Sequence, residues 1–178
     1  MTTFVEKVLA VHEALAAHDL PHAIGGALAL GYCIGEPRAT VDVDVNVFVA
    51  PEEADSVLDA LPDPVRVLAK HRKLAARDGQ VRVFWDDTAL DLFFGYHEFH
   101  DHAASRARTV PFGDSNIPVL DCTDLVVFKA FFARGKDWVD IEAMAEAGTI
   151  DRAQALGWVG RLLGPDHPSF ERLAAILG

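Results

Sequence analysis

Between Val41 and Val49 the chain alternates apolar and polar positions. Valine occupies every odd position, and Asp42, Asp44 and Asn46 lie between the valines. A period of two is typical of a β-strand, whose successive side chains point to opposite faces. We therefore predict a strand over 41–49 that carries these three polar side chains on one face.

The two aspartates of this strand are the first candidates for chemistry. Residues two apart on a strand are roughly 6–7 Å apart at the backbone, so the side chains of Asp42 and Asp44 can converge on a common ion. Like charges repel, and a hard divalent cation such as Mg²⁺, which prefers oxygen ligands, would neutralise them. The alternative is that both face water on an ordinary amphipathic strand. Aspartate is unfavourable inside strands, and this local cost favours a functional reason for the pair.

Apolar periodicity and end signals predict the other elements. A capping box of Thr3 and Glu6 begins a helix that ends near Asp19, and Gly25-Gly26 leads from a short strand at 21–24 into a helix. Further helices are expected at 51–61, 123–133, 136–147, 151–163 and 168–177, a helical start within 97–108, strands at 81–85, 89–94 and 117–120, and hairpin turns at 86–88 and 113–116.

The order of these elements indicates the fold class. Strands dominate the first two thirds and helices the last third, which predicts an α/β or α+β fold with a mixed sheet flanked by helices. The 178 residues suffice for one domain with a core. We expect 1–178 to be a single domain, with a core over about 1–120 and a helical part over about 121–178.

Composition and charge narrow the class of protein. No apolar run can cross a bilayer and the N-terminus lacks the order of a signal peptide, so we expect a cytoplasmic protein without a membrane partner. Cys33 and Cys122 have no metal-like spacing and suit a reducing compartment. The net charge of −11 repels nucleic acid unless basic residues cluster. They cluster once, between Arg66 and Arg82, either as a solvated surface or as a phosphate-facing patch.

An ordered set of motifs resembles a known family. The set is Gly25-Gly26, then Arg38 to Asp44, Leu90-Asp91-Leu-Phe, Asp124 to Lys129, and Lys136-Asp137-Trp-Val-Asp140. It resembles the minimal nucleotidyltransferases of the DNA polymerase β superfold, over roughly residues 20–145. The abortive-infection type, many members of which are toxins of toxin–antitoxin pairs, is the subgroup it resembles most. The resemblance implies a nucleotidyltransferase-like sheet for the fold predicted above.

The resemblance gives the strand aspartates a shared role. Asp42 and Asp44 would hold two Mg²⁺ ions, and Asp91 would complete the site as a third metal ligand or as the base for the attacking hydroxyl. Two metals that bracket the transferred phosphorus stabilise the attacking and leaving oxygens together. The resemblance therefore implies Mg²⁺ as the cofactor and a nucleoside triphosphate as the substrate.

Two further motifs would contact the triphosphate. The resemblance implies that Gly25-Gly26 lets backbone amides approach phosphate at a helix N-terminus. A tight strand-to-helix turn is the alternative for the glycines. Arg38 suits a phosphate-facing role, and a salt bridge to Glu36 or to the aspartates is its alternative.

The C-terminal motifs supply a lysine and acidic partners. Lys129 lies in an otherwise apolar helix segment, where an unpaired charge is costly to bury. By resemblance it would reach the triphosphate or the aspartate cluster, and a snorkelling lysine is the alternative. Lys136, Asp137 and Asp140 resemble the motif that follows in the family, and the resemblance implies that Lys136 and Asp140 contribute to binding the nucleotide. Asp137 could simply favour the helix dipole. We expect Asp140 to pair with Lys129.

A cluster of histidines competes with this interpretation. His97, His100 and His102, with neighbouring carboxylates, could bind zinc. The family resemblance gives this segment no role, and no fourth ligand is evident. A polar loop over the active site is the other interpretation.

The function that these motifs favour is Mg²⁺-dependent transfer of a nucleoside monophosphate to an acceptor, with release of pyrophosphate. The acceptor could be an RNA such as tRNA, a protein hydroxyl or a small molecule such as an aminoglycoside. A toxin role, with an antitoxin protein as partner, depends on family analogy. The alternative is a non-catalytic module that binds a nucleotide or a protein and has kept the fold.

Overall fold

The computed structural model describes residues 2–95 and 97–178, and the chain divides into two compact units. The first unit contains the chain up to Leu28 together with Ala39–Leu120. The second contains Ala29–Arg38 and Asp121–Gly178, so most of helix α2 (Gly26–Ile34) belongs to it. The sequence analysis places this stretch of α2 in the core over about 1–120, whereas in the structure it belongs to the second unit. That 1–178 is a single domain stays a prediction.

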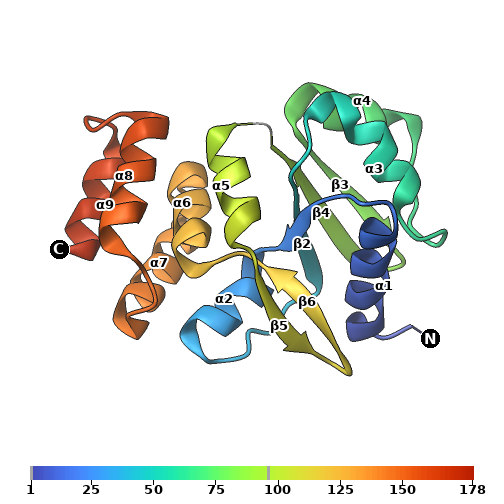
Figure 1. Cartoon of the computed structure of the whole chain (residues 1–178), viewed down its shortest axis with the longest axis horizontal. Coiled ribbons are helices and arrows are strands. Elements are labelled where there is room, and N and C mark those ends of the chain that lie inside the picture. Colours follow the sequence, from blue (N-terminus) through green and yellow to red (C-terminus); the bar gives the residue numbers. More distant parts are fainter. Residues whose placement is uncertain (1, 96) are drawn as a thin grey trace. The chain divides into compact units, whose positions relative to one another are not determined.

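Within the described residues, the first unit is built around a six-stranded mixed sheet (Figure 1). The strand order is β3-β4-β2-β1-β6-β5; the pairs β2–β4 and β1–β6 are parallel, and the other neighbours are antiparallel. The strands are β1 (His22–Ile24), β2 (Asp42–Val47), β3 (Gln80–Trp85), β4 (Thr88–Phe94), β5 (Arg108–Phe112) and β6 (Ser115–Val119). The predicted α/β class with a mixed sheet is confirmed.

Short helices accompany this sheet. They are α1 (Phe4–Ala17), the start of α2, the 3₁₀ turn η1 (Pro51–Glu53), α3 (Ala54–Ala60), α4 (Ala69–Asp78) and α5 (Glu98–Arg106). The predicted capping box begins α1, because the Glu6 amide donates to Thr3 Oγ1 at 3.2 Å and the Thr3 amide donates to Glu6 Oε2 at 2.6 Å. Val8, Val11 and Leu15 of α1 are fully buried, as a helix with one apolar face requires.

The alternation around the two aspartates has the predicted result. In β2, Val43 and Val45 are fully buried, whereas Asp42 and Asp44 are half-buried on the opposite face. The strand begins at Asp42, one residue later than predicted, and Val41 before it is 72% exposed. Strand β2 therefore presents its carboxylates on one face of the sheet, and its buried valines pack on the opposite face.

Helix α4 lies in the basic run, where we had predicted no regular element. Only His71 and Ala75 of this helix are buried, so the apolar period that marks a helix is almost missing. Gly79 ends it with a φ of 65°, the left-handed conformation that glycine adopts most readily.

The second unit is helical, as predicted for the C-terminal part. Helix α6 (Cys122–Phe132) contacts α7 (Gly135–Ala147), α8 (Arg152–Leu163) and α9 (Pro168–Leu177). Asp121 begins α6 by accepting a hydrogen bond from the Thr123 amide at 3.0 Å, and Gly148 ends α7 with a φ of 71°. These four helices occur where the sequence predicted them.

A disulfide within this unit joins Cys33 of α2 to Cys122, the first residue of α6. Both cysteines are buried. We had treated them as separate residues suited to a reducing compartment, and that interpretation was wrong about their pairing. They are 89 residues apart, and their spacing carries no information about a contact over such a distance.

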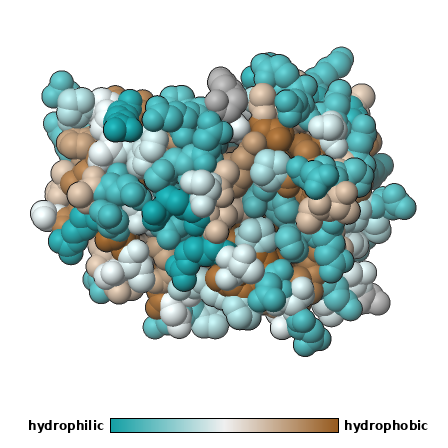
Figure 2. Space-filling model, viewed as in Figure 1, coloured by the Kyte–Doolittle hydropathy of each residue, from teal (hydrophilic) through white to brown (hydrophobic). Residues whose placement is uncertain are grey.

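The exposed surface is largely polar on the face seen in Figure 2, where hydrophilic side chains cover most of the view. Among the helices that the structure describes, none is long and apolar enough to cross a bilayer.

Candidate active site

Three carboxylates lie on one face of two neighbouring strands. Asp44 of β2 is the register partner of Asp91 of β4 in a parallel pair, so the two side chains project from the same face. Asp42 lies two residues before Asp44 and shares that face. Asn46 follows on the same face and is buried. The structure thus places the three aspartates that the sequence singled out on one face of two neighbouring strands.

The glycine turn lies directly against this acidic face. The Gly25 amide donates to the Asp44 carbonyl at 2.8 Å, which fixes the turn beside β2. A Cβ at position 25 would lie 2.7 Å from Asn46 Nδ2, and a Cβ at position 26 would overlap the Asp44 carboxylate. Gly26 also has a φ of 52° and is the first residue of α2. Only glycine leaves room at this helix start for the carboxylate beside it.

Arg82, which ends the basic run and which the sequence analysis did not connect with the aspartates, contacts this cluster. Arg82 of β3 is the register partner of Asp91 in the antiparallel β3–β4 hairpin. Its Nε donates to Asp91 Oδ1 at 2.7 Å and its Nη2 to Asp91 Oδ2 at 2.6 Å. Nη2 also lies 3.7 Å from Asp42 Oδ2. The hydrogen bonds that Arg82 donates to Asp91, and then the negative charge of that carboxylate, raise the pKa of Arg82 above its usual range.

The donor chemistry of this cluster fits a hard divalent cation, because carboxylate oxygens are the ligands that Mg²⁺ prefers. The present arrangement fits less well. Within 2–95 and 97–178, no three histidine, cysteine, aspartate or glutamate side chains gather closely enough to hold a metal ion. Both oxygens of Asp91 accept hydrogen bonds from Arg82, so this third carboxylate is directed to an arginine. Metal ligation by Asp42, Asp44 and Asp91 stays a prediction.

Lys129 is buried beside two aspartates of the second unit. Its Nζ donates to Asp140 Oδ2 at 2.7 Å and lies 3.6 Å from Asp137 Oδ1, and the lysine is buried. The predicted pair of Lys129 and Asp140 is confirmed. Burial raises the pKa of the Asp137 carboxyl, but hydrogen bonds from Arg134 and the charge of Lys129 outweigh burial and lower it.

This pairing explains how α6 tolerates a lysine among apolar neighbours. Asp137 is fully buried and also accepts hydrogen bonds from the Arg134 amide, Nε and Nη2. A buried charge that lost its partner would cost about 3–5 kcal/mol. The ion pairs therefore give Lys129 a structural role, and contact with a triphosphate stays a prediction.

Two other predicted phosphate contacts are exposed residues of the second unit. Arg38 lies in the segment that follows α2 and is exposed. Lys136 is exposed at the second position of α7. Their contacts with phosphate stay predictions.

The histidine cluster has local structural roles. His97 caps α5, because its Nδ1 accepts a hydrogen bond from the Phe99 amide at 3.2 Å. The ring of His100 packs against Gly95, where a Cβ would overlap it. Neither these residues nor His102 belong to a metal-binding group of three within the described chain. The structure gives no support to the zinc interpretation.

Much of the charge in the basic run is neutralised by nearby acids. Arg72 lies 3.1 Å from Asp55 and 2.6 Å from Asp59, and Arg77 lies 2.6 Å from Asp78. These pairs favour the interpretation of the run as a solvated surface.

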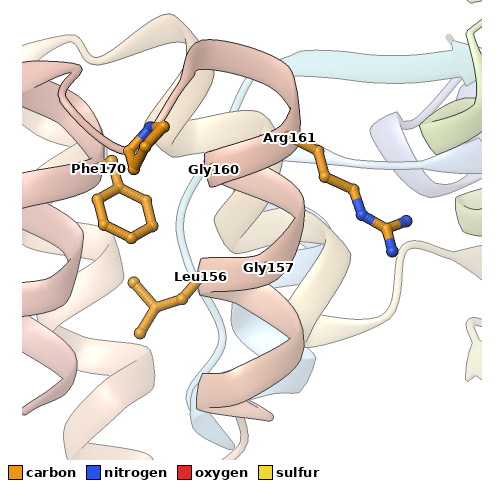
Figure 3. A pocket seen from close by; sticks show the side chains of 6 residues that line it. Leu156, Gly157, Gly160, Arg161 and Phe170 are labelled. Atoms are coloured by element: carbon orange, nitrogen blue, oxygen red, sulfur yellow. The ribbon is translucent and has the colours of Figure 1, made fainter.

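A pocket in the second unit is lined by residues of α8, of α9 and of the turn between them. It has a volume of about 430 Å³. Figure 3 shows Phe170 and Leu156 on its wall, whereas the guanidinium of Arg161 points away from them. Its lining residues are Leu156, Gly157, Gly160, Arg161, Pro165 and Phe170, none of which the sequence analysis selected.

Comparison with known proteins gives the architecture a name. No protein-family profile and no curated sequence matches the chain. The solved structure of the antibiotic-resistance factor ANT(2″)-Ia in solution matches with a TM-score of 0.60 and 15% identity, over 99% of this chain and 96% of that one. The chain has the nucleotidyltransferase fold. A crystal structure of ANT(2″)-Ia in complex with adenylyl-2″-tobramycin matches with a TM-score of 0.57 and 16% identity, over 97% and 95% of the two chains.

A second solved protein has a similar fold. The antigenic nucleotidyltransferase-like protein from Paracoccidioides brasiliensis matches with a TM-score of 0.50 and 15% identity, over 95% of this chain and 92% of that one. Identities this low establish the fold alone. The fold implied by the sequence resemblance is therefore confirmed, and activity must be argued from the site.

Proposed function

We propose that this chain is a nucleotidyltransferase that moves a nucleoside monophosphate from a nucleoside triphosphate to an acceptor hydroxyl, releasing pyrophosphate. One observation carries the proposal: the Asp44 carboxylate lies between the glycine turn at the start of α2 and the neighbouring strand carboxylate of Asp91. A helix start favours phosphate, and paired carboxylates favour a divalent cation. A non-catalytic sheet has no need of both features on one face.

The groups of the chain divide the work. The amides at the start of α2 would bind phosphate oxygens, next to the Asp44 carboxylate that packs against Gly26. Asp42, Asp44 and Asp91 would hold Mg²⁺, which supplies charge compensation for the triphosphate when bound. Once freed from Arg82, an oxygen of Asp91 could accept the proton of the acceptor hydroxyl. Positioning and electrostatics would provide most of the acceleration.

For the acceptor we favour a small cationic molecule with hydroxyl groups, such as an aminoglycoside. The fold matches ANT(2″)-Ia over nearly the full length of both chains, and one structure of that protein contains adenylyl-2″-tobramycin. The net charge of −11 attracts cationic molecules and repels RNA. The ion pairs within the basic run weaken the case for a tRNA acceptor and for a toxin with an antitoxin partner.

The disulfide bears on where such an enzyme works. Disulfides persist in oxidising compartments and are rare in the cytosol. The buried bond between Cys33 and Cys122 therefore weighs against the cytoplasmic location expected from the sequence.

A non-catalytic module that binds a nucleotide is the second candidate, and Arg82 is the observation that favours it. A guanidinium that remained on both oxygens of Asp91 would leave a nucleotide-binding surface without its third carboxylate. Such a protein would bind a triphosphate and release no pyrophosphate.

The test incubates the purified chain with each labelled nucleoside triphosphate and Mg²⁺, in separate reactions with aminoglycosides, tRNA or protein. We expect label on the aminoglycoside, with calorimetric binding of the triphosphate. Binding without label in any of the three acceptor pools would support the module instead. Label on tRNA or protein would keep the nucleotidyltransferase and correct the acceptor.

A further inference from the structure

The pair of Arg82 and Asp91 differs from the other surface ion pairs of the first unit. The acidic partners of Arg72 are 67–70% exposed at their side chains, whereas the side chain of Asp91 is only 16% exposed. Surface pairs contribute little because water already solvates both charges. A carboxylate that is mostly removed from water needs a partner more, and Arg82 supplies two parallel hydrogen bonds.

The guanidinium also reaches a second carboxylate of the same site. Nη2 of Arg82 lies 2.6 Å from Asp91 Oδ2 and 3.7 Å from Asp42 Oδ2. The same nitrogen thus lies near one carboxylate oxygen from β2 and one from β4. A cation shared by these two carboxylates would have to lie in the same region, because it too must contact both oxygens.

The position of Arg82 allows its side chain to turn away from the carboxylates. Arg82 lies on β3, an edge strand of the sheet, and its side chain is 52% exposed. A long side chain on an exposed edge can turn into water without disturbing the strand, since its neighbours Val81 and Val83 hold β3 through the buried face.

We propose that Arg82 is an internal counter-ion that competes with the divalent cation for Asp91 and Asp42, so that metal binding requires Arg82 to turn away. This inference rests on the proposed function, because it concerns the regulation of the same site. It also accounts for the absence of a three-ligand group among the described residues. In the free protein the third carboxylate is neutralised by Arg82, and metal completes the site only by displacing the guanidinium.

The inference predicts a gain in metal affinity when the competitor is removed. Arg82→Gln leaves Asp91 with a neutral neighbour, so Mn²⁺, used as a spectroscopic substitute for Mg²⁺, no longer has to displace a charge. We expect at least tenfold tighter binding of Mn²⁺, measured by electron paramagnetic resonance on the full chain. Arg82→Lys keeps the charge but loses the bidentate geometry, and should bind about threefold tighter.

The matched control is Arg77→Gln, which removes the same charge from a surface pair with Asp78. It should change the affinity for Mn²⁺ by less than twofold. Circular dichroism and thermal melting check that each variant is folded, and Arg82→Lys carries the test if Arg82→Gln does not fold.

The outcomes separate the inference from the proposed function. Tighter Mn²⁺ binding in the Arg82 variants, and not in Arg77→Gln, supports the inference. If in addition no protein releases pyrophosphate, the proposed function fails and the inference still holds. Equal or weaker Mn²⁺ binding in the Arg82 variants overturns the inference. This outcome does not count against the proposed nucleotidyl transfer. An equal gain in Arg77→Gln, or no Mn²⁺ binding in any protein, overturns the inference as well.

Discussion

Replacing Gly26 by alanine tests how closely the glycine turn and the acidic face depend on each other. A left-handed φ costs an alanine about 1–2 kcal/mol. The new Cβ would also overlap the Asp44 carboxylate, which must then leave its rotamer at a cost of about 0.5–1.5 kcal/mol. We therefore expect Gly26→Ala to lower the free energy of unfolding by about 1.5–3.5 kcal/mol.

The other end of α2 offers a matched control. Gly35 has a φ of 71°, and a Cβ there would meet nothing within 4 Å. Gly35→Ala should therefore cost only the backbone part, about 1–2 kcal/mol. Urea unfolding, with the slope held constant, measures both variants. In an Asp44→Ala background, the cost of Gly26→Ala should fall towards that of Gly35→Ala. Equal costs for the two glycines in the native background would refute the reasoning.

Two further predictions concern stability. Burial lowers the pKa of His12 and His22, so the unfolded chain binds more protons below about pH 6.5 and the free energy of unfolding should fall as pH falls through that range; urea unfolding at pH 7.5 and 5.5 checks this, and a His22→Gln variant with an unchanged pH dependence would contradict it. Reduction of the bond between Cys33 and Cys122 should lower the free energy of unfolding by about 4 kcal/mol, because a loop of 89 residues is released; melting with and without dithiothreitol measures it, and coincident curves would count against a formed disulfide.

Local signals were enough to predict most of the elements. The capping box of Thr3, the valine alternation of β2 and the N-cap at Asp121 each depend on residues a few positions apart. Because such contacts join residues that are close in the sequence, they can be predicted without knowledge of the fold. The resemblance added the order of the motifs, and the strand register places Asp44 beside Asp91, with Asp42 on the same face. Their joint binding of metal stays a prediction.

The role of Arg82 was missed because it depends on strand register. We predicted a three-residue turn at 86–88, which would place Arg82 opposite Leu92. The structure has a two-residue turn, with Trp85 opposite Thr88, so Arg82 falls opposite Asp91. A slip of one residue exchanges the two faces of a strand. The preference of hairpins for two-residue turns was the signal that could have found this pair.

The disulfide and helix α4 escaped prediction for other reasons. Cys33 and Cys122 meet only through the packing of the second unit, which no spacing rule describes. Helix α4 buries too few apolar residues to show a period, although Gly79 was a usable end signal.

The most direct test of the account is pyrophosphate release from labelled nucleoside triphosphate with Mg²⁺ and an aminoglycoside, comparing Asp44→Asn with Asp114→Asn. Both variants remove one carboxylate, but Asp114 lies exposed in the turn between β5 and β6. We expect wild type and Asp114→Asn to release pyrophosphate equally, and Asp44→Asn to lose at least a hundredfold. Equal release from Asp44→Asn and wild type would contradict the claim that this acidic face carries out nucleotidyl transfer.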